Sequence, residues 1–170
     1  MKSFSYLIVT LAVLISACSP TEVPPSPPES YFLALITPPE GLPIDFEGDE
    51  GVGDYNADSG LLRLQAVSLL NGRDKIEITI RKAKAGVLGT YNIGPFGEAS
   101  TNVRAEFIDG YNEWNARSIS GQLEITQFDA TENGSAYWLS GTFEFEAAAQ
   151  NEKTVSISYG EFQRSAILAE

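Results

Sequence analysis

The sequence predicts an all-β domain, either an antiparallel β-sandwich or a flattened β-barrel of about ten strands, and three observations support this. From residue 31 onward, no long segment keeps the period of an amphipathic helix. Apolar and polar residues alternate instead, between clusters of Gly, Asn, Asp and Pro that are typical of turns. The 170 residues, 43% of them hydrophobic, are enough to enclose one such core without disulfides.

The expected strands follow this alternation along the chain. In the clearest case Ile76, Ile78 and Ile80 share one face while polar residues occupy the other, as a sheet with one dry and one wet face requires. Asn71-Gly72 is a hairpin signal that joins this strand to the preceding one. The predicted strands span residues 31–37, 43–47, 61–69, 74–82, 88–93, 102–108, 112–119, 121–128, 136–148 and 153–163.

The hairpin around Asn133-Gly134 is expected to be irregular. A two-residue turn there would set Ile125 opposite Thr142, which places apolar side chains on opposite faces of the sheet. We therefore expect a longer loop or a bulge that sets Ile125 against Phe143.

The leader predicts export and a lipid anchor. Lys2 precedes the apolar run YLIVTLAVLI, so residues 1–17 read as a cleaved, helical signal peptide. Residues 15–18, ISAC, resemble the lipobox of bacterial lipoproteins, which implies that Cys18 is lipidated and anchors the protein to a membrane. Ser19 after the cysteine implies the outer membrane and leaves open its periplasmic or surface face. Residues 18–30 then form a proline-rich linker before one β-domain at 31–170.

Composition excludes several function classes. The 23 acidic and 11 basic residues give a formal net charge of -12, which disfavours nucleic acid as a partner. The chain has no histidine and its one cysteine is Cys18, so His-dependent catalysis, His-ligated metals and a thiol nucleophile in the domain are excluded. We therefore expect that the protein is not an enzyme and that it has no catalytic residues.

Three segments near the end of the chain, GQLEITQFD, LSGTFEFEAA and VSISYGEF, resemble a family of uncharacterised secreted lipoprotein β-domains common in Bacteroidetes. The resemblance extends over residues 31–162. It implies the all-β fold and a cell-envelope location, and it implies no activity.

The segment DYNADSG offers a candidate metal site at Asp54, Asn56 and Asp58, whose side-chain oxygens recur at alternate positions as in a calcium loop. An EF-hand would need Gly and Glu where this chain has Ser59 and Gln65, so that interpretation fails. Weak calcium binding and a solvated acidic turn remain as alternatives, and no other cofactor is expected.

Candidate ligand-binding residues are Trp138, Tyr111 and Trp114, because aromatic rings among polar groups stack on sugars, although core packing is the alternative for each. The predicted register also places Glu124 opposite Glu144 on the wet face, a carboxylate pair of the kind that glycosidases use.

These features leave several functions open. The first is a noncatalytic binding or structural module whose partner is an envelope glycan or protein. The alternatives are a calycin-like carrier of a small ligand, a carbohydrate-binding surface lipoprotein and a carboxylate-based hydrolase.

Overall fold

The computed structural model describes residues 29–49, 51–83, 87–98, 100–112, 114–149 and 153–170. The predicted signal peptide, Cys18 and the linker as far as residue 28 lie outside these residues. Within the described part, no helix has the length and apolar character needed to cross a membrane.

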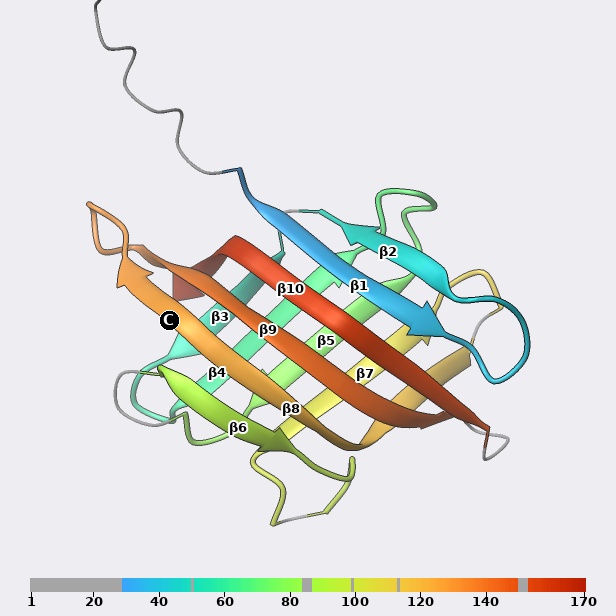
Figure 1. Ribbon diagram of the computed structural model, residues 1–170. Coiled ribbons are helices and arrows are strands. Elements are labelled where there is room, and N and C mark those ends of the chain that lie inside the picture. The colour runs from blue at the N-terminus through green and yellow to red at the C-terminus, as the bar shows by residue number, and fades with distance from the viewer. Residues whose placement is uncertain (1–28, 50, 84–86, 99, 113, 150–152) are drawn as a thin grey trace, which may run out of the picture.

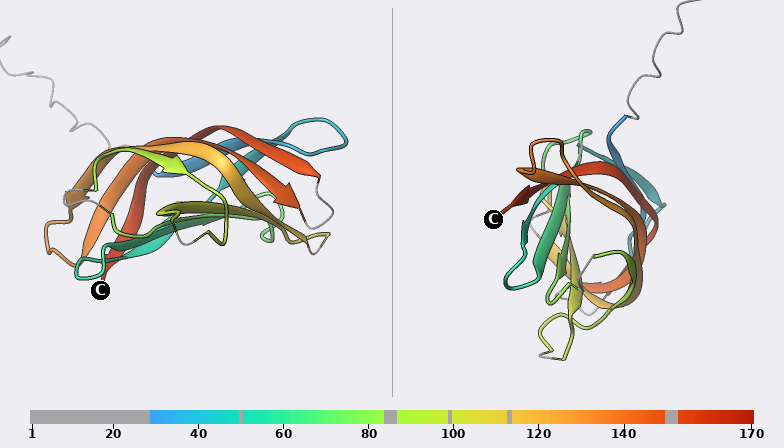
Figure 2. Two further views of the ribbon diagram at one scale, coloured as in Figure 1. Left: turned by 90° about the horizontal axis from the view of Figure 1, so that it is seen from below. Right: turned by 90° about the vertical axis from the view of Figure 1, so that its left-hand side faces the viewer.

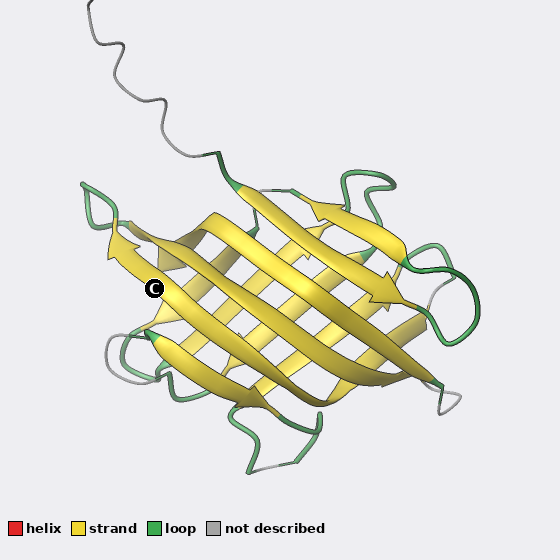
Figure 3. Ribbon diagram, in the orientation of Figure 1, coloured by secondary structure: helices red, strands yellow, loops and turns green. Residues whose placement is uncertain are grey.

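The described part is all-β, as predicted, and its strands form one mixed ten-stranded sheet (Figure 3). Parallel pairings join β10 to β3 and β6 to β7, so the sheet is not wholly antiparallel. The strands are β1 (Tyr31–Thr37), β2 (Ile44–Gly48), β3 (Val52–Asn56), β4 (Leu61–Val67), β5 (Lys75–Ile80), β6 (Gly89–Ile93), β7 (Val103–Asp109), β8 (Trp114–Ala130), β9 (Ala136–Ala149) and β10 (Thr154–Ala169).

The sheet folds into two packed layers whose strands cross at a steep angle (Figures 1 and 2). The front layer, as seen in Figure 1, contains β1, β2, β6, β8, β9 and β10, and the back layer contains β3, β4, β5 and β7. The hydrogen-bonded ladder continues around two corners, because β8 also pairs with β7 and β10 also pairs with β3. This ring-like arrangement combines features of both predicted architectures.

Bulges allow the long strands to turn these corners. β8 has an irregularity between Ser118 and Ser120, where its partner changes from β7 to β6. β10 has two more, and each contains a residue in the left-handed region, Tyr159 (φ 51°) or Arg164 (φ 50°). A bulge bends its strand and increases the local twist, so the end of β10 reaches the back layer.

Apolar side chains from both layers fill the space between them. Ile76, Ile78 and Ile80 are all buried, as their alternation predicted. In the front layer the ring of Phe32 packs against those of Phe143 and Phe162, with centroid distances of 5.2 and 6.1 Å. This core holds the outer faces of the two layers in fixed positions.

Three strand predictions are wrong. We predicted no strand at β3, because its residues belong to the acidic segment that was interpreted as a loop, but they pair with β4 and β10. The segments predicted at 112–119 and 121–128 are one strand, β8, which continues through its bulge. The last strand does not stop at residue 163 but runs to Ala169, where it pairs with β3.

The predicted bulge in the β8–β9 hairpin is present, but the predicted register is wrong. Near the turn, Ala130 pairs with Tyr137, and an irregularity between Ile125 and Gln127 then sets Ile125 opposite Gly141 rather than Phe143. The physical reason is that the extra residue lies in β8, at Thr126, and not in β9, so Gly141 takes the position opposite Ile125. A side chain at Gly141 would place its Cβ 2.7 Å from Cζ of Phe162, so only glycine fits there.

Candidate functional site

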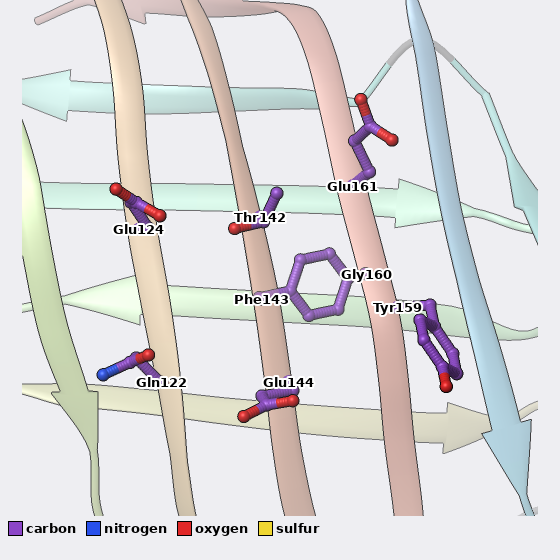
Figure 4. A pocket seen from close by; sticks show the side chains of 8 residues that line it. All are labelled: Gln122, Glu124, Thr142, Phe143, Glu144, Tyr159, Gly160 and Glu161. Carbon is purple, nitrogen blue, oxygen red and sulfur yellow. The ribbon is translucent and has the colours of Figure 1, made fainter.

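A groove of about 460 Å³ crosses the outer face of β8, β9 and β10 (Figure 4). It is a surface depression that is open to solvent along the strands. Its lining consists of Gln122, Glu124, Thr142, Phe143, Glu144, Tyr159, Gly160 and Glu161.

Strand register arranges the polar lining in rows. Glu124 pairs with Thr142, and Thr142 pairs in turn with Glu161, so these three side chains form one row across the groove. Gln122 pairs with Glu144. These two side chains begin a second row, which leads toward Tyr159 on β10. Neighbouring strands lie about 4.8 Å apart, so each row presents a line of hydrogen-bonding groups at nearly regular spacing.

Tyr159 occupies one wall of the groove because of the first bulge in β10. Its backbone is in the left-handed region and its side chain is 83% exposed. Gly160 follows, and a Cβ there would lie 2.5 Å from the ring of Phe143, so the floor requires glycine. Non-glycine residues rarely adopt this conformation, and bulges often aim a side chain beside a binding site.

Glu161, on the opposite row from Tyr159, is held by a tyrosine of β1. The hydroxyl of Tyr31 donates a hydrogen bond of 2.6 Å to Oε1 of Glu161. This hydrogen bond, followed by burial and by the charge of Glu161, raises the pKa of Tyr31 above its ordinary value. The contact fixes one carboxylate of the groove.

The groove offers acceptor oxygens, an amide, hydroxyl groups and an exposed aromatic ring, and none of its described lining residues is basic. Saccharides are bound by such a combination, since their hydroxyls donate to carboxylates and amides while their apolar faces stack on rings.

The predicted pairing of Glu124 with Glu144 is wrong. Because the bulge in β8 shifts the register, Glu124 lies opposite Thr142 and Glu144 lies opposite Gln122. The two carboxylates are diagonal neighbours in one groove, so the directly opposed pair that suggested glycosidase chemistry is not formed.

The structure does not gather the predicted aromatic residues. Trp138 is half-buried beneath the guanidinium of Arg164, which lies 4.7 Å from its ring centroid. Trp114 packs edge-on against Phe107, and Tyr111 is 76% exposed in the turn between β7 and β8. Trp114 and Trp138 lie toward opposite ends of the β8–β9 ladder, so they do not share one site.

The candidate metal residues have contacts with protein groups. Asp54 lies in β3 and forms an ion pair of 3.7 Å with Arg63. Oδ1 of Asn56 accepts hydrogen bonds from the backbone and hydroxyl of Ser59, while Asp58 is exposed in that turn. In the described ranges, no three carboxylate or other metal-ligating side chains are grouped closely enough to hold an ion. Calcium binding stays a prediction.

Sequence reasoning missed Tyr159 and Glu161, although a signal for them exists. The buried residues Val155 and Ile157 are in one phase of alternation, whereas Phe162 is in the other. This change of phase around Tyr159-Gly160 requires an extra residue, and glycine inside a strand often marks a bulge.

The sequence pattern of one protein family, described as Domain of unknown function (DUF6252), matches residues 50–165. These residues include β3 to β9, most of β10 and every residue that lines the groove. The match starts after β1 and β2, so it is shorter than the resemblance inferred from the sequence. No curated protein and no solved structure matches the chain.

Proposed function

The chain belongs to that family, and because the family carries no assigned activity, we propose a function from the groove: noncatalytic binding of saccharides by a lipid-anchored protein of the cell envelope. The observation that carries the proposal is the position of Tyr159, an exposed ring held by a bulge beside two rows of hydrogen-bonding side chains.

The carboxylates indicate which saccharides fit. Glu124, Glu144 and Glu161 accept hydrogen bonds from hydroxyl or amino groups, but they repel the carboxylates of uronic acids. We therefore expect neutral or amino sugars to bind and acidic polysaccharides to be rejected. Binding to such a groove requires no metal ion.

Binding without catalysis is supported by the shape of the groove. Glycoside hydrolysis needs an acid and a second carboxylate on either side of a bond held in a site that controls water. Here Glu124 and Glu144 project from neighbouring strands on one open face.

The packing between the two layers gives less support to a carrier function than to saccharide binding. A carrier needs a large space between its layers, whereas Phe32, Phe143 and Phe162 pack against one another there. A ligand in that region would have to displace core side chains.

The leader supports the proposed location. The signal peptide at 1–17, the lipobox cysteine Cys18 and the proline-rich linker would place the domain a short distance from the outer membrane. The linker leads directly into β1, which belongs to the front layer with the groove.

The proposal is tested by measuring affinity for soluble oligosaccharides with the full chain in mild detergent. We expect millimolar or tighter binding of a neutral hexasaccharide, little binding of polygalacturonate and no change on adding a chelator. Tyr159→Ala should weaken binding about tenfold, because stacking on an aromatic ring contributes on the order of 1 kcal/mol or more.

Tyr111→Ala is the matched control, since it also removes an exposed tyrosine ring but lies outside the groove. Equal effects of the two substitutions, or no binding of any neutral sugar, would refute the proposed function.

A further inference from the structure

Two strands of the front layer, β2 and β6, have an edge that faces away from the rest of the sheet (Figure 1). Among the described residues, β2 pairs along its length only with β1. β6 pairs along its length with β8 and meets β7 only where Ile93 pairs with Val103. An unpaired edge presents backbone donors and acceptors that another strand can use, so proteins usually protect such edges.

The edge of β2 is protected. The carbonyl of Glu47 on this edge accepts a hydrogen bond of 2.8 Å from the backbone of Leu69, which covers one end. Exposed carboxylates at Asp45 and Glu47 flank the remainder, and Pro43 precedes the strand. Charged side chains and proline are common means of preventing strand addition.

The edge of β6 has open backbone groups. The N–H of Gly94 donates a hydrogen bond of 3.0 Å to the carbonyl of Val103, so the backbone of Gly94 points away from β8. Backbone direction alternates along a strand, so Asn92 and Thr90 also present their N–H groups to that side. The N–H and carbonyl of Thr90 lie beyond the single contact with β7 and face the open edge.

A groove of about 410 Å³ runs along this edge. Its far wall is held in place, since the backbone N–H of Arg81 donates to the carbonyl of Asn102 at 2.6 Å. None of the described residues that line the groove carries a charge, although the chain as a whole has a formal charge of -12. The lining consists of Thr90, Tyr91, Asn92, Gly94, Ser100, Thr101, Asn102 and Val103.

We propose that this groove binds an extended, uncharged peptide segment of another protein, which adds to β6 as a further strand. The open backbone groups of Thr90 provide the pairing, and the neutral polar lining favours a segment without charged side chains. A second copy of this chain is disfavoured as the occupant, because two molecules of charge -12 repel each other. The proposal does not depend on saccharide binding, since it concerns a different groove.

The test is amide hydrogen exchange of the full chain in mild detergent, with the probe peptide acetyl-Thr-Val-Thr-Val-Thr-Val-amide at millimolar concentration. We expect the Thr90 amide to exchange about tenfold more slowly with the peptide, as a new backbone hydrogen bond would cause. The Asp45 amide at the protected edge should exchange at an unchanged rate.

The control is the same peptide with every backbone amide methylated, which keeps the side chains but cannot donate to the carbonyl of Thr90. We expect this peptide to give no protection. The unmodified peptide should also slow exchange of the Asn92 amide, and Thr90→Pro, which removes the neighbouring edge donor, should abolish that protection.

The proposal is overturned if the methylated peptide protects the Thr90 amide, or if the unmodified peptide does not protect it. Neither measurement depends on whether Thr90→Pro folds. Protection of Thr90 that rises with protein concentration in the absence of peptide would also overturn it, because the occupant would then be a second copy.

Discussion

The outer faces of the two layers carry charge differently. On the back layer, oppositely charged side chains form ion pairs, Asp54 with Arg63 across strands at 3.7 Å and Glu77 with Lys75 of the same strand, β5, at 3.0 Å. Glu106 of β7 likewise pairs with Arg117 of β8 at 3.3 Å.

The two rows that cross the front layer contain carboxylates and no basic residue. Their side chains, read from β6 to β2, are Thr90, Glu124, Thr142, Glu161, Leu33 and Glu47 in one row, and in the other Asn92, Gln122 and Glu144, which end at the bulge of β10 that carries Tyr159.

This difference indicates a division of roles. The ion pairs Asp54–Arg63 and Glu106–Arg117 join neighbouring strands, so these charges serve the fold, although Glu77 also lies directly opposite Glu106. Carboxylates on the front layer repel one another slightly and stabilise nothing directly opposite them, which is expected of groups retained for binding. Among the described residues, the three carboxylates of the groove, Glu124, Glu144 and Glu161, form no ion pair with a basic side chain.

The largest expected effect tests a feature that both layers share. Gly141 in the front layer and Gly53 in the back layer each lie against a carbonyl of the neighbouring strand, where a Cβ would be 2.1 Å from Glu124 O or 1.9 Å from Arg63 O. We expect Gly141→Ala and Gly53→Ala each to lower the free energy of unfolding by about 3 kcal/mol or more in urea denaturation.

Gly134→Ala is the control, because a Cβ there meets nothing within 4 Å and only the left-handed backbone (φ 68°) opposes it. Its expected cost is about 1 kcal/mol. A cost at Gly141 no greater than that at Gly134 would mean that β8 and β9 are not packed closely at Gly141.

The next largest effect is on the free energy of unfolding when one carboxylate is replaced by an amide. The change should have opposite signs on the two layers. Glu106→Gln weakens the ion pair with Arg117 and should cost about 1 kcal/mol, since Glu106 also accepts a hydrogen bond from Asn115. Glu144→Gln removes one of several like charges and should raise stability by a few tenths of a kcal/mol, an increase that 1 M salt abolishes. Urea denaturation of both variants at low and high salt checks this. The contrast between the layers is lost if the signs agree.

The smallest expected effect concerns the hydrogen bond that holds Glu161. The folded state raises the pKa of Tyr31, so folding favours the protonated phenol. Its contribution to stability is present below the unfolded pKa of about 10 and is lost as pH rises through the higher folded value. Stability measured from pH 9 upward should therefore fall less steeply for Tyr31→Phe than for the parent chain. Parallel curves would show that the contact with Glu161 is not maintained in solution.

Much of the fold could be predicted from the sequence, because strict alternation identifies strands such as β5, where Ile76, Ile78 and Ile80 point into the core. β3 could not be predicted in this way. Its side chains are partly exposed on both faces, and the strand exists because β4 and β10 lie on either side of it.

The candidate site was predictable only in part. Glu124 and Glu144 were selected correctly as neighbours on one face, but the extra residue at Thr126 changes which side chains face each other. The position of Tyr159 depends on the first bulge in β10, and the change of phase in the sequence signals this bulge without indicating where the side chain points. Periodicity therefore predicts which residues share a face, whereas bulges decide which of them meet.

The most direct test of the central claim is a map of backbone amide chemical shifts in the full chain as a neutral hexasaccharide is added. The proposed function predicts changes confined to the front layer, in residues 122–124, 142–144 and 158–161, with the back-layer strands β3, β4 and β5 unaffected. Changes centred on Asp54 and Arg63, or on the turn that contains Tyr111, would contradict it.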